Sequence, residues 1–180
     1  MTRVAIQGVA GSYSEEAAQR LLGSDASIVE CRDFQSTFDA IVSGLAEAAV
    51  VPVENKIVGR IDQSSDLLTA SGYRVVERLS LRVQHVVAGA PGAKFDDVTS
   101  VRSHVEALKQ CQRFLADHPR MKQVIGADTA SSIRRVVEDG DLTKAAIGSR
   151  RAALLYGATI LAEGIADDPD NWTTFYLIAN

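Results

Sequence analysis

RVAIQGVAGSYSEEAAQRLLG, residues 3–23, decides the fold class, because it reads as a strand, a tight turn and a helix. The β-rich run 3–7 is followed by a turn that contains two glycines. Ser12 and Glu15 have the spacing of a capping box, so a helix is expected to begin there and to end at Gly23. A unit of this kind at the start of the chain is typical of α/β proteins.

The same pattern continues along the first part of the chain. A helix is expected over 36–45, with Ser36 and Asp39 as its capping residues, and an apolar stripe is expected along one face. That stripe consists of Phe38, Ile41, Val42 and Leu45. Further elements are expected as a buried strand at Ala49–Val53, a helix at Asp62–Ala70 that stops at Gly72, and a long β-type run from Tyr73 to Ala88.

A second α/β series follows a Gly, Ala and Pro-rich segment at 89–92. Its expected elements are a strand at Val98–Val101, a helix from Ser103 to about Ala116, a helix capped by Asp128 or Thr129, a strand at Ala145–Gly148, a helix at Ser149–Tyr156 and a strand at Thr159–Ala162. The last β-type run, Trp172–Ala179, follows a polar break and is expected to cross back to the first series.

These patterns predict two α/β lobes, residues 1–78 with 166–180 as the first and 79–165 as the second. Two crossings of the chain between such lobes would form a hinge and a ligand cleft.

Composition narrows the range of functions. The chain has 180 residues, with 46% hydrophobic and 23% charged residues and a formal net charge of −4, which disfavours nucleic acid as a partner. No apolar run approaches the roughly 20 residues of a membrane span, so we expect a cytoplasmic protein. Cys31 and Cys111 are far apart and the three histidines lack metal-ligand spacing, so we expect no metal and no cofactor.

Polar residues gather at the turns that open helices and at the end of one buried strand. The turns 8–14, 103–104 and 128–132 offer helix N-termini that favour anions, although simple helix capping explains the same residues. Glu54, Asn55 and Lys56 follow the apolar run that ends at Val53, at the edge of an α/β sheet where ligands bind, or else they form a polar turn. In the final run, neighbouring threonines lie on opposite faces of a strand.

These pieces, in this order, resemble the catalytic domain of prephenate dehydratase from about Arg3 to Ile178. The residues that carry the resemblance are GVAGSYSEEAA at 8–18, Phe34–Gly59 ending in VVPVENKIVG, SHVEAL at 103–108, Asp128-Thr129-Ala130, and Tyr156-Gly157 through Asn171-Trp172-Thr173-Thr174-Phe175.

The resemblance implies a fold of two α/β lobes like a type II periplasmic binding protein, with prephenate bound between them. The implied reaction is loss of carbon dioxide and of the ring hydroxyl, which gives phenylpyruvate on the route to phenylalanine. Thr173 matches the family threonine credited with assisting departure of the hydroxyl, and Asn55 and Asn171 match asparagines that orient the substrate. The substrate-binding residues implied are Gly11, Ser12, Tyr13, Glu54, Lys56, Ser103, His104, Thr129, Ala130, Thr174 and Phe175.

The sequence departs from the family pattern at two positions that change the charge of the expected site. Thr174 stands where the family motif has arginine, and Lys56 stands where it has serine. Arginine grips a carboxylate with two hydrogen bonds and threonine cannot, so we expect Lys56 to supply the lost charge. Val105 and Glu106 also replace the usual proline and glutamine and indicate a remodelled pocket.

Three functions stay open at this point: a prephenate dehydratase, a non-aromatising prephenate decarboxylase of a natural-product pathway, and a non-catalytic binder of an aromatic or cyclohexadienyl acid. Proteins of the family commonly carry a C-terminal ACT domain that binds phenylalanine, whereas this sequence ends at Asn180, so either feedback control is absent or the sequence is truncated. Without that domain we expect no inhibition by phenylalanine, and we expect a homodimer, if one forms, to use the catalytic lobes.

Overall fold

The computed structural model describes residues 2–180 and divides them into two compact units. The first unit contains residues 2–83 and Asn171–Asn180, and the second contains Gln84–Asp170. Each unit has its own β-sheet with helices, so the two α/β lobes expected from the sequence are present. Residue 1 of the expected first lobe lies outside the described residues.

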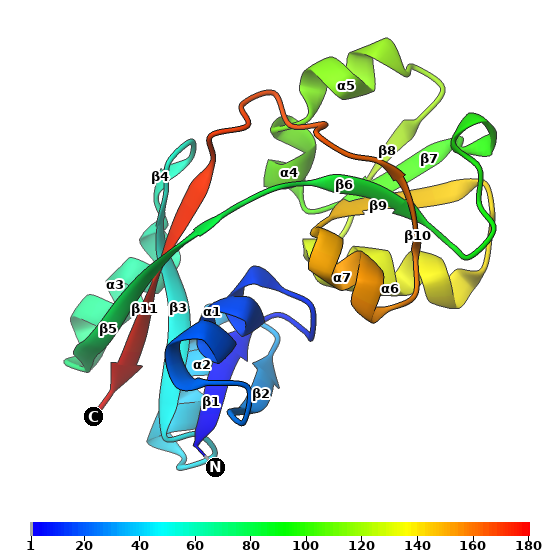
Figure 1. The fold of residues 1–180 in the computed structure, drawn as a ribbon. Coiled ribbons are helices and arrows are strands. Elements are labelled where there is room, and N and C mark those ends of the chain that lie inside the picture. Colours follow the sequence, from blue (N-terminus) through cyan, green and yellow to red (C-terminus); the bar gives the residue numbers. More distant parts are fainter. Residues whose placement is uncertain (1) are drawn as a thin grey trace. The chain divides into compact units, whose positions relative to one another are not determined.

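The first unit is built on a mixed sheet with strand order β2-β1-β3-β11-β5, and the short β4 pairs with β3 (Figure 1). β1 runs parallel to β2 and β3, whereas β11 runs antiparallel to β3 and β5. The strands are β1 (Arg3–Gln7), β2 (Ser27–Cys31), β3 (Ala48–Asn55), β4 (Gly59–Arg60), β5 (Arg74–Arg82) and β11 (Trp172–Ala179). The last strand of the chain therefore returns to the first unit, as the sequence predicted.

Helices cover the two faces of this sheet and create two apolar cores. The helices are α1 (Tyr13–Leu22), α2 (Phe34–Val42) and α3 (Asp62–Ser71). On one face, Val50, Phe175 and Leu177 pack with Ala17 and Ala18 of α1. On the other face, the alternate strand residues pack with α2, and this second core contains Val51, Val53, Ile178, Phe38 and Ile41. Alternation along each strand thus decides which side chains lie on the α1 face.

The second unit has a five-stranded sheet in the order β10-β6-β9-β7-β8. Its strands are β6 (Val86–Gly89), β7 (Ser100–Ser103), β8 (Lys122–Ile125), β9 (Lys144–Gly148) and β10 (Thr159–Ala162). Its helices are the 3₁₀ turn η1 (Phe95–Asp97), α4 (Val105–Lys109), α5 (Gln112–Asp117), α6 (Thr129–Asp139) and α7 (Arg150–Leu155). Its core contains Val87, Val101, Leu108, Leu115 and Ile147.

Two helix predictions need correction. α2 begins two residues earlier than expected because Asp33, and not Ser36, is its N-cap; the Asp33 carboxylate accepts the backbone N–H of Ser36 in a complete capping box. The predicted apolar stripe also ends early, since Val42 is 77% and Leu45 54% exposed.

The helix expected from Ser103 to Ala116 is interrupted. It forms two short helices, α4 and α5, and the N-cap of α4 is His104, whose Nδ1 accepts the N–H of Glu106 at 3.2 Å. The Ser103 hydroxyl instead donates to the carbonyl of Ile147 at 2.7 Å.

The β-type run 73–88 is not one strand. It forms β5 in the first unit and β6 in the second, so the lobe boundary expected after residue 78 falls inside β5, which belongs wholly to the first unit. Strands β2, β4 and β8 were not predicted.

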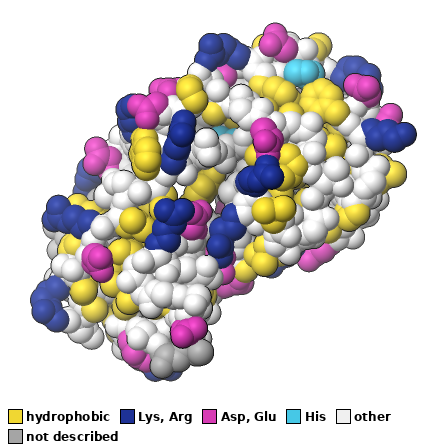
Figure 2. All heavy atoms as spheres, in the orientation of Figure 1, with side chains coloured by type: hydrophobic (Ala, Val, Ile, Leu, Met, Phe, Trp, Pro, Cys, Tyr) yellow, Lys and Arg dark blue, Asp and Glu magenta, His cyan; other side chains and the backbone are white. Residues whose placement is uncertain are grey.

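Basic and acidic side chains are interspersed on the face of the molecule seen in Figure 2, without a large patch of either sign. Among the described helices, none combines the length and the apolar character that crossing a membrane requires.

Candidate active site

Three side chains expected to act together lie side by side in the first unit. Asn55 is the last residue of β3, Thr173 is the second residue of β11, and the two are direct partners across the antiparallel ladder. Asn171 immediately precedes β11. All three are buried, and Thr173 faces the same side of the sheet as Phe175, which is the α1 face.

The Asn55 amide joins the three residues. Its Nδ2 donates to Asn171 Oδ1 at 2.8 Å and to Thr173 Oγ1 at 2.9 Å. Its Oδ1 accepts the backbone N–H groups of Ile57 and Val58 at 2.9 and 3.0 Å. Because two backbone donors meet the oxygen, the orientation of the amide is fixed and its nitrogen must point to Asn171 and Thr173.

This arrangement determines what the Thr173 hydroxyl can do. An amide nitrogen only donates, so Thr173 Oγ1 accepts from Asn55 and keeps its own proton for another acceptor. Within residues 2–180, no group takes that proton. The site therefore presents a hydroxyl donor, held by neutral amides, at the carboxyl end of β3, the edge of an α/β sheet at which ligands bind.

The turn that opens α1 lies at the same edge, because β1 and β3 are parallel neighbours. Ser12 Oγ caps the helix by accepting the N–H of Glu15 at 3.2 Å. The N–H of Gly11 donates to Glu15 Oε2 and the N–H of Ala10 donates to Glu30 Oε1, both at 2.6 Å. The expectation that unpaired amides of this turn attract an anion is thus wrong for these two groups, since carboxylates of the chain already occupy them.

The remaining candidates of the first unit differ in what they can reach. Glu54 and Lys56 flank Asn55 and are exposed. Thr174 lies on the opposite face from Thr173, as predicted, and its Oγ1 is 3.0 Å from Ser80 Oγ. Phe175 is only 2% exposed and packs in the α1 core, so its side chain belongs to the core, and its assignment as a substrate-binding residue stays a prediction. Tyr13 packs against the edge of the same core.

The candidates of the second unit come together at one edge of its sheet. Ser103 and Ile125 are partners at the carboxyl ends of the parallel strands β7 and β8, and the N–H of Gly126 donates to the Ser103 carbonyl at 2.8 Å. His104 follows β7, and Thr129 and Ala130 begin α6. Asp128 caps α6 by accepting the N–H of Ser131 at 2.7 Å. The first turn of α6 therefore begins close to this edge of the sheet.

The side chains do not form a metal site in the part of the chain that the structure describes. Across residues 2–180, no cluster of three or more His, Cys, Asp and Glu side chains is arranged for a metal ion. Both cysteines are free thiols, and burial raises the pKa of Cys111 to about 12. The Cys111 thiol is therefore protonated at neutral pH and is a poor nucleophile.

Sequence reasoning missed the feature that aims Asn55. β3 contains an extra residue, Val53, opposite β11, because Glu54 pairs with Thr174 while Pro52 pairs with Phe175. Pro52 was the available signal, since proline inside a strand is confined to edges and bulges. Glu15 and Glu30 were likewise not predicted to anchor the turn before α1.

Comparison with known proteins identifies the family. The family described as prephenate dehydratase matches residues 4–180. The chain belongs to the prephenate dehydratase family.

Relatives and solved structures agree with this assignment. The arogenate dehydratase/prephenate dehydratase 1 of Arabidopsis thaliana is 37% identical over 177 residues, which are 98% of this chain and 45% of that protein. The chain thus spans less than half the length of this curated relative. The structure of prephenate dehydratase from Arthrobacter aurescens in complex with L-Phe superposes with a TM-score of 0.89 at 28% identity, over 99% of this chain and 60% of the other.

Two further structures extend the comparison. GqqA, described as a novel type of quorum-quenching acylase, superposes with a TM-score of 0.85 at 30% identity, over 99% of this chain and 64% of the other. The ligand-binding component of an ABC-type import system from Staphylococcus aureus, with zinc bound, has a TM-score of 0.51 at 12% identity, over 99% of this chain and 65% of the other. The last likeness concerns the fold alone and agrees with the predicted architecture of periplasmic binding proteins.

Proposed function

We propose that this chain is a lyase that converts prephenate to phenylpyruvate by decarboxylating dehydration, on the route to phenylalanine. The observation that carries the proposal is the buried cluster in which Asn55 holds Asn171 and Thr173 by hydrogen bonds of 2.8 and 2.9 Å. Membership of the prephenate dehydratase family supports the same reaction class.

The reaction makes a limited demand on the protein. The bond between the ring and its carboxylate breaks, and the electron pair that it leaves completes the aromatic ring. At the opposite carbon the C–O bond breaks, and the hydroxyl leaves with its electron pair and gains a proton to become water. Because aromatisation drives both events, the protein has to hold the substrate and to stabilise the charge on the departing oxygen.

The Thr173 hydroxyl is suited to that second task. It is too weak an acid to be ionised at neutral pH, so it acts as a positioned hydrogen-bond donor to the leaving oxygen. One donor of this kind, held in place before the reaction, contributes on the order of 10²–10³ in rate. Asn55 is a positioning residue for this donor, and Asn171 completes its orientation.

Acyl transfer, the activity named for GqqA, requires a general base, which the cluster of Asn55, Asn171 and Thr173 does not supply. A threonine nucleophile needs a neighbouring base that accepts its proton. Within residues 2–180, the hydrogen-bond partner of the Thr173 hydroxyl is the Asn55 amide nitrogen, which donates. The cluster therefore favours a lyase over an acylase.

The non-aromatising decarboxylase is the second candidate. It is favoured by Thr174, a neutral residue whose hydroxyl pairs with Ser80 where the family pattern has an arginine. We propose that Lys56 supplies the missing positive charge to the substrate, from the residue next to Asn55. The non-catalytic binder is the third candidate. Arogenate is an alternative candidate substrate to prephenate, because relatives are named for either compound.

Product analysis separates these candidates. The protein is incubated with prephenate and, separately, with arogenate at neutral pH, and the products are identified by proton NMR and ultraviolet absorbance. Phenylpyruvate or phenylalanine, respectively, supports the dehydratase and identifies its substrate. A non-aromatic acid that keeps the ring hydroxyl supports the decarboxylase. Saturable binding without turnover refutes both enzymatic proposals.

A further inference from the structure

The end of β3 is displaced by one residue relative to its neighbour. Between the partner pairs Pro52–Phe175 and Glu54–Thr174, β3 advances by two residues while β11 advances by one. Val53 is therefore the extra residue of a β-bulge, a device that re-aims the side chains that follow it.

The bulge decides which side chain lies beside Thr173. Val50 faces α1, so strict alternation along an unbroken strand would bring Glu54 to the α1 face and send Asn55 to the other. With the bulge, Glu54 lies opposite Thr174, and Asn55 lies opposite Thr173. A carboxylate in the place of Asn55 only accepts, so it would take the Thr173 proton that the proposed reaction needs.

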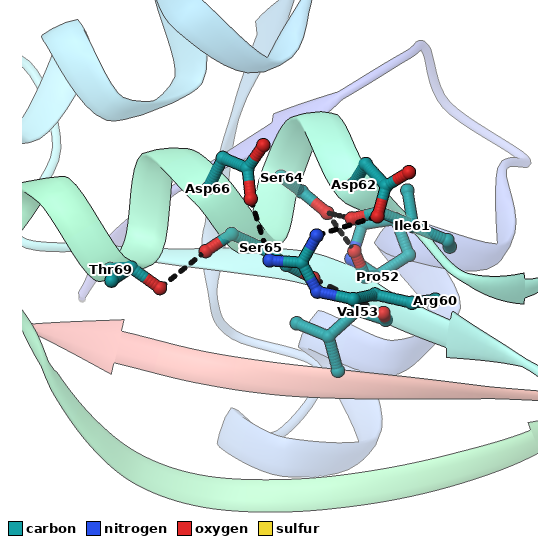
Figure 3. Close-up of polar contacts among 9 residues, drawn as sticks. All are labelled: Pro52, Val53, Arg60, Ile61, Asp62, Ser64, Ser65, Asp66 and Thr69. Atoms are coloured by element: carbon teal, nitrogen blue, oxygen red, sulfur yellow. Dashed lines mark hydrogen bonds and ion pairs between the residues drawn. The ribbon is translucent and has the colours of Figure 1, made fainter.

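The backbone around the bulge is held by the first turns of α3 (Figure 3). The Ser64 hydroxyl donates to the carbonyl of Pro52 and also lies 3.3 Å from that of Ile61. The carbonyl of Val53 accepts the N–H of Ile61 at 2.9 Å and the Ser65 hydroxyl at 3.3 Å. Two consecutive carbonyls of the bulge thus receive donors from one helix. Ser64 is completely buried, which gives its hydroxyl no alternative contact with water.

Two ion pairs also connect α3 to β4, the strand that precedes it. Arg60 of β4 reaches Asp62 and Asp66 with its two terminal nitrogens, at 2.5 and 2.6 Å (Figure 3). Arg60 is itself the strand partner of Glu54, so contacts connect β4 both to α3 and to the residue that follows the bulge.

We propose that Ser64 is a positioning residue of the reaction centre: by holding the bulge at Val53, it keeps Asn55 beside Thr173 and so keeps the Thr173 proton available. The proposal rests on the proposed function and adds to it a residue that makes no contact with the cluster itself. It predicts that loss of the Ser64 hydroxyl changes turnover through the orientation of the Asn55 amide.

The test compares three variants of the full chain. Ser64→Ala removes the hydroxyl, and Ser64→Thr retains it. Thr69→Ala is the matched control, because it removes another hydroxyl of α3, one that bonds the Ser65 carbonyl at 2.9 Å and leaves the bulge untouched. We expect Ser64→Ala to lower kcat at least tenfold with KM within twofold, Ser64→Thr to recover most of kcat, and Thr69→Ala to match the wild type.

A second readout does not depend on turnover. Both protons of the Asn55 side-chain amide are bonded, so their NMR signals should exchange slowly in the wild type. Ser64→Ala should shift these signals and accelerate their exchange, and Thr69→Ala should not. If Ser64→Ala leaves the Asn55 signals unchanged, the proposal is overturned, whether or not the wild type turns over prephenate. If Ser64→Ala shifts the Asn55 signals but the wild-type protein has no lyase activity, the positioning role of Ser64 stands and the proposed function fails.

Discussion

Asn55→Asp is the substitution that most sharply separates the hydrogen-bond network from mere packing. It keeps the size of the side chain and replaces the amide nitrogen with an oxygen that cannot donate. The variant therefore loses the 2.8 Å bond to Asn171, and the contact with Thr173 reverses because the Thr173 hydroxyl now donates to the new carboxylate. It also places a carboxylate in a buried position, next to the oxygen of Asn171.

The magnitude follows from the lost bond and from the buried carboxylate. The lost bond is worth about 1 kcal/mol net, and burial of a carboxylate beside the Asn171 oxygen costs at least about 1 kcal/mol more, so the free energy of unfolding should fall by about 2 kcal/mol. For a protein of this size, a loss of about 2 kcal/mol lowers Tm by roughly 4–8 °C.

Urea denaturation measures the effect in the unit that contains the substitution. Trp172 is the single tryptophan and lies between Asn171 and Thr173, so its fluorescence reports on this unit. Asn180→Asp, the same chemical change at an exposed position, is the control. An Asn55→Asp variant within about 0.5 kcal/mol of the wild type would refute the network as described, since the lost bond to Asn171 alone should exceed that difference.

Three other predictions concern separate parts of the chain. Burial lowers the pKa of His85, against the opposing effect of its bond to Gln110, so the unfolded chain takes up a proton more readily than the folded state as the pH falls through about 6.5. Stability should therefore fall as the pH drops from 7.5 to 5, and His85→Gln should reduce that fall in urea titrations at both pH values; equal pH dependence in the two proteins contradicts this. Gly148→Ala should lower the free energy of unfolding by about 1–3 kcal/mol in the same assay, because its new methyl group would lie 2.5 Å from Ile133 Cδ1. An unchanged urea midpoint would contradict this and show that α6 can move away. Lys56→Ala should raise KM for prephenate at least tenfold if its charge holds a carboxylate, and wild-type kinetics would remove Lys56 from the site.

Local chemistry made part of the fold predictable. Ser12 and Gly23 delimit α1 because the serine oxygen and the glycine conformation each satisfy a specific requirement of a helix end. The final strand was also predictable, since a polar break precedes an uninterrupted β-type run. Asn55, Asn171 and Thr173 were placed together by their resemblance to family motifs, and the antiparallel pairing of β3 with β11 gives the physical reason for their contact.

Other features depend on contacts distant in sequence. Val42 and Leu45 continue an apolar periodicity, yet no partner element among residues 2–180 buries them, so periodicity alone overstates the core. β8 is mostly exposed and acquires its strand conformation from pairing with β7, which no local pattern reveals. Strict alternation along the strand does not predict the bulge at Val53. The bulge depends on carbonyl acceptors that receive hydrogen bonds from α3 residues twelve positions away in the sequence.

Turnover of prephenate by Thr173→Val tests the central claim most directly, because this change preserves the shape of the side chain and removes only its hydroxyl. Thr159→Val is the control, since it removes a strand hydroxyl from the second unit. We predict that kcat for phenylpyruvate formation falls at least about 100-fold in Thr173→Val and stays near the wild-type value in Thr159→Val. A Thr173→Val protein that forms phenylpyruvate within threefold of the wild-type kcat would contradict the role of Thr173 as the hydrogen-bond donor to the leaving oxygen.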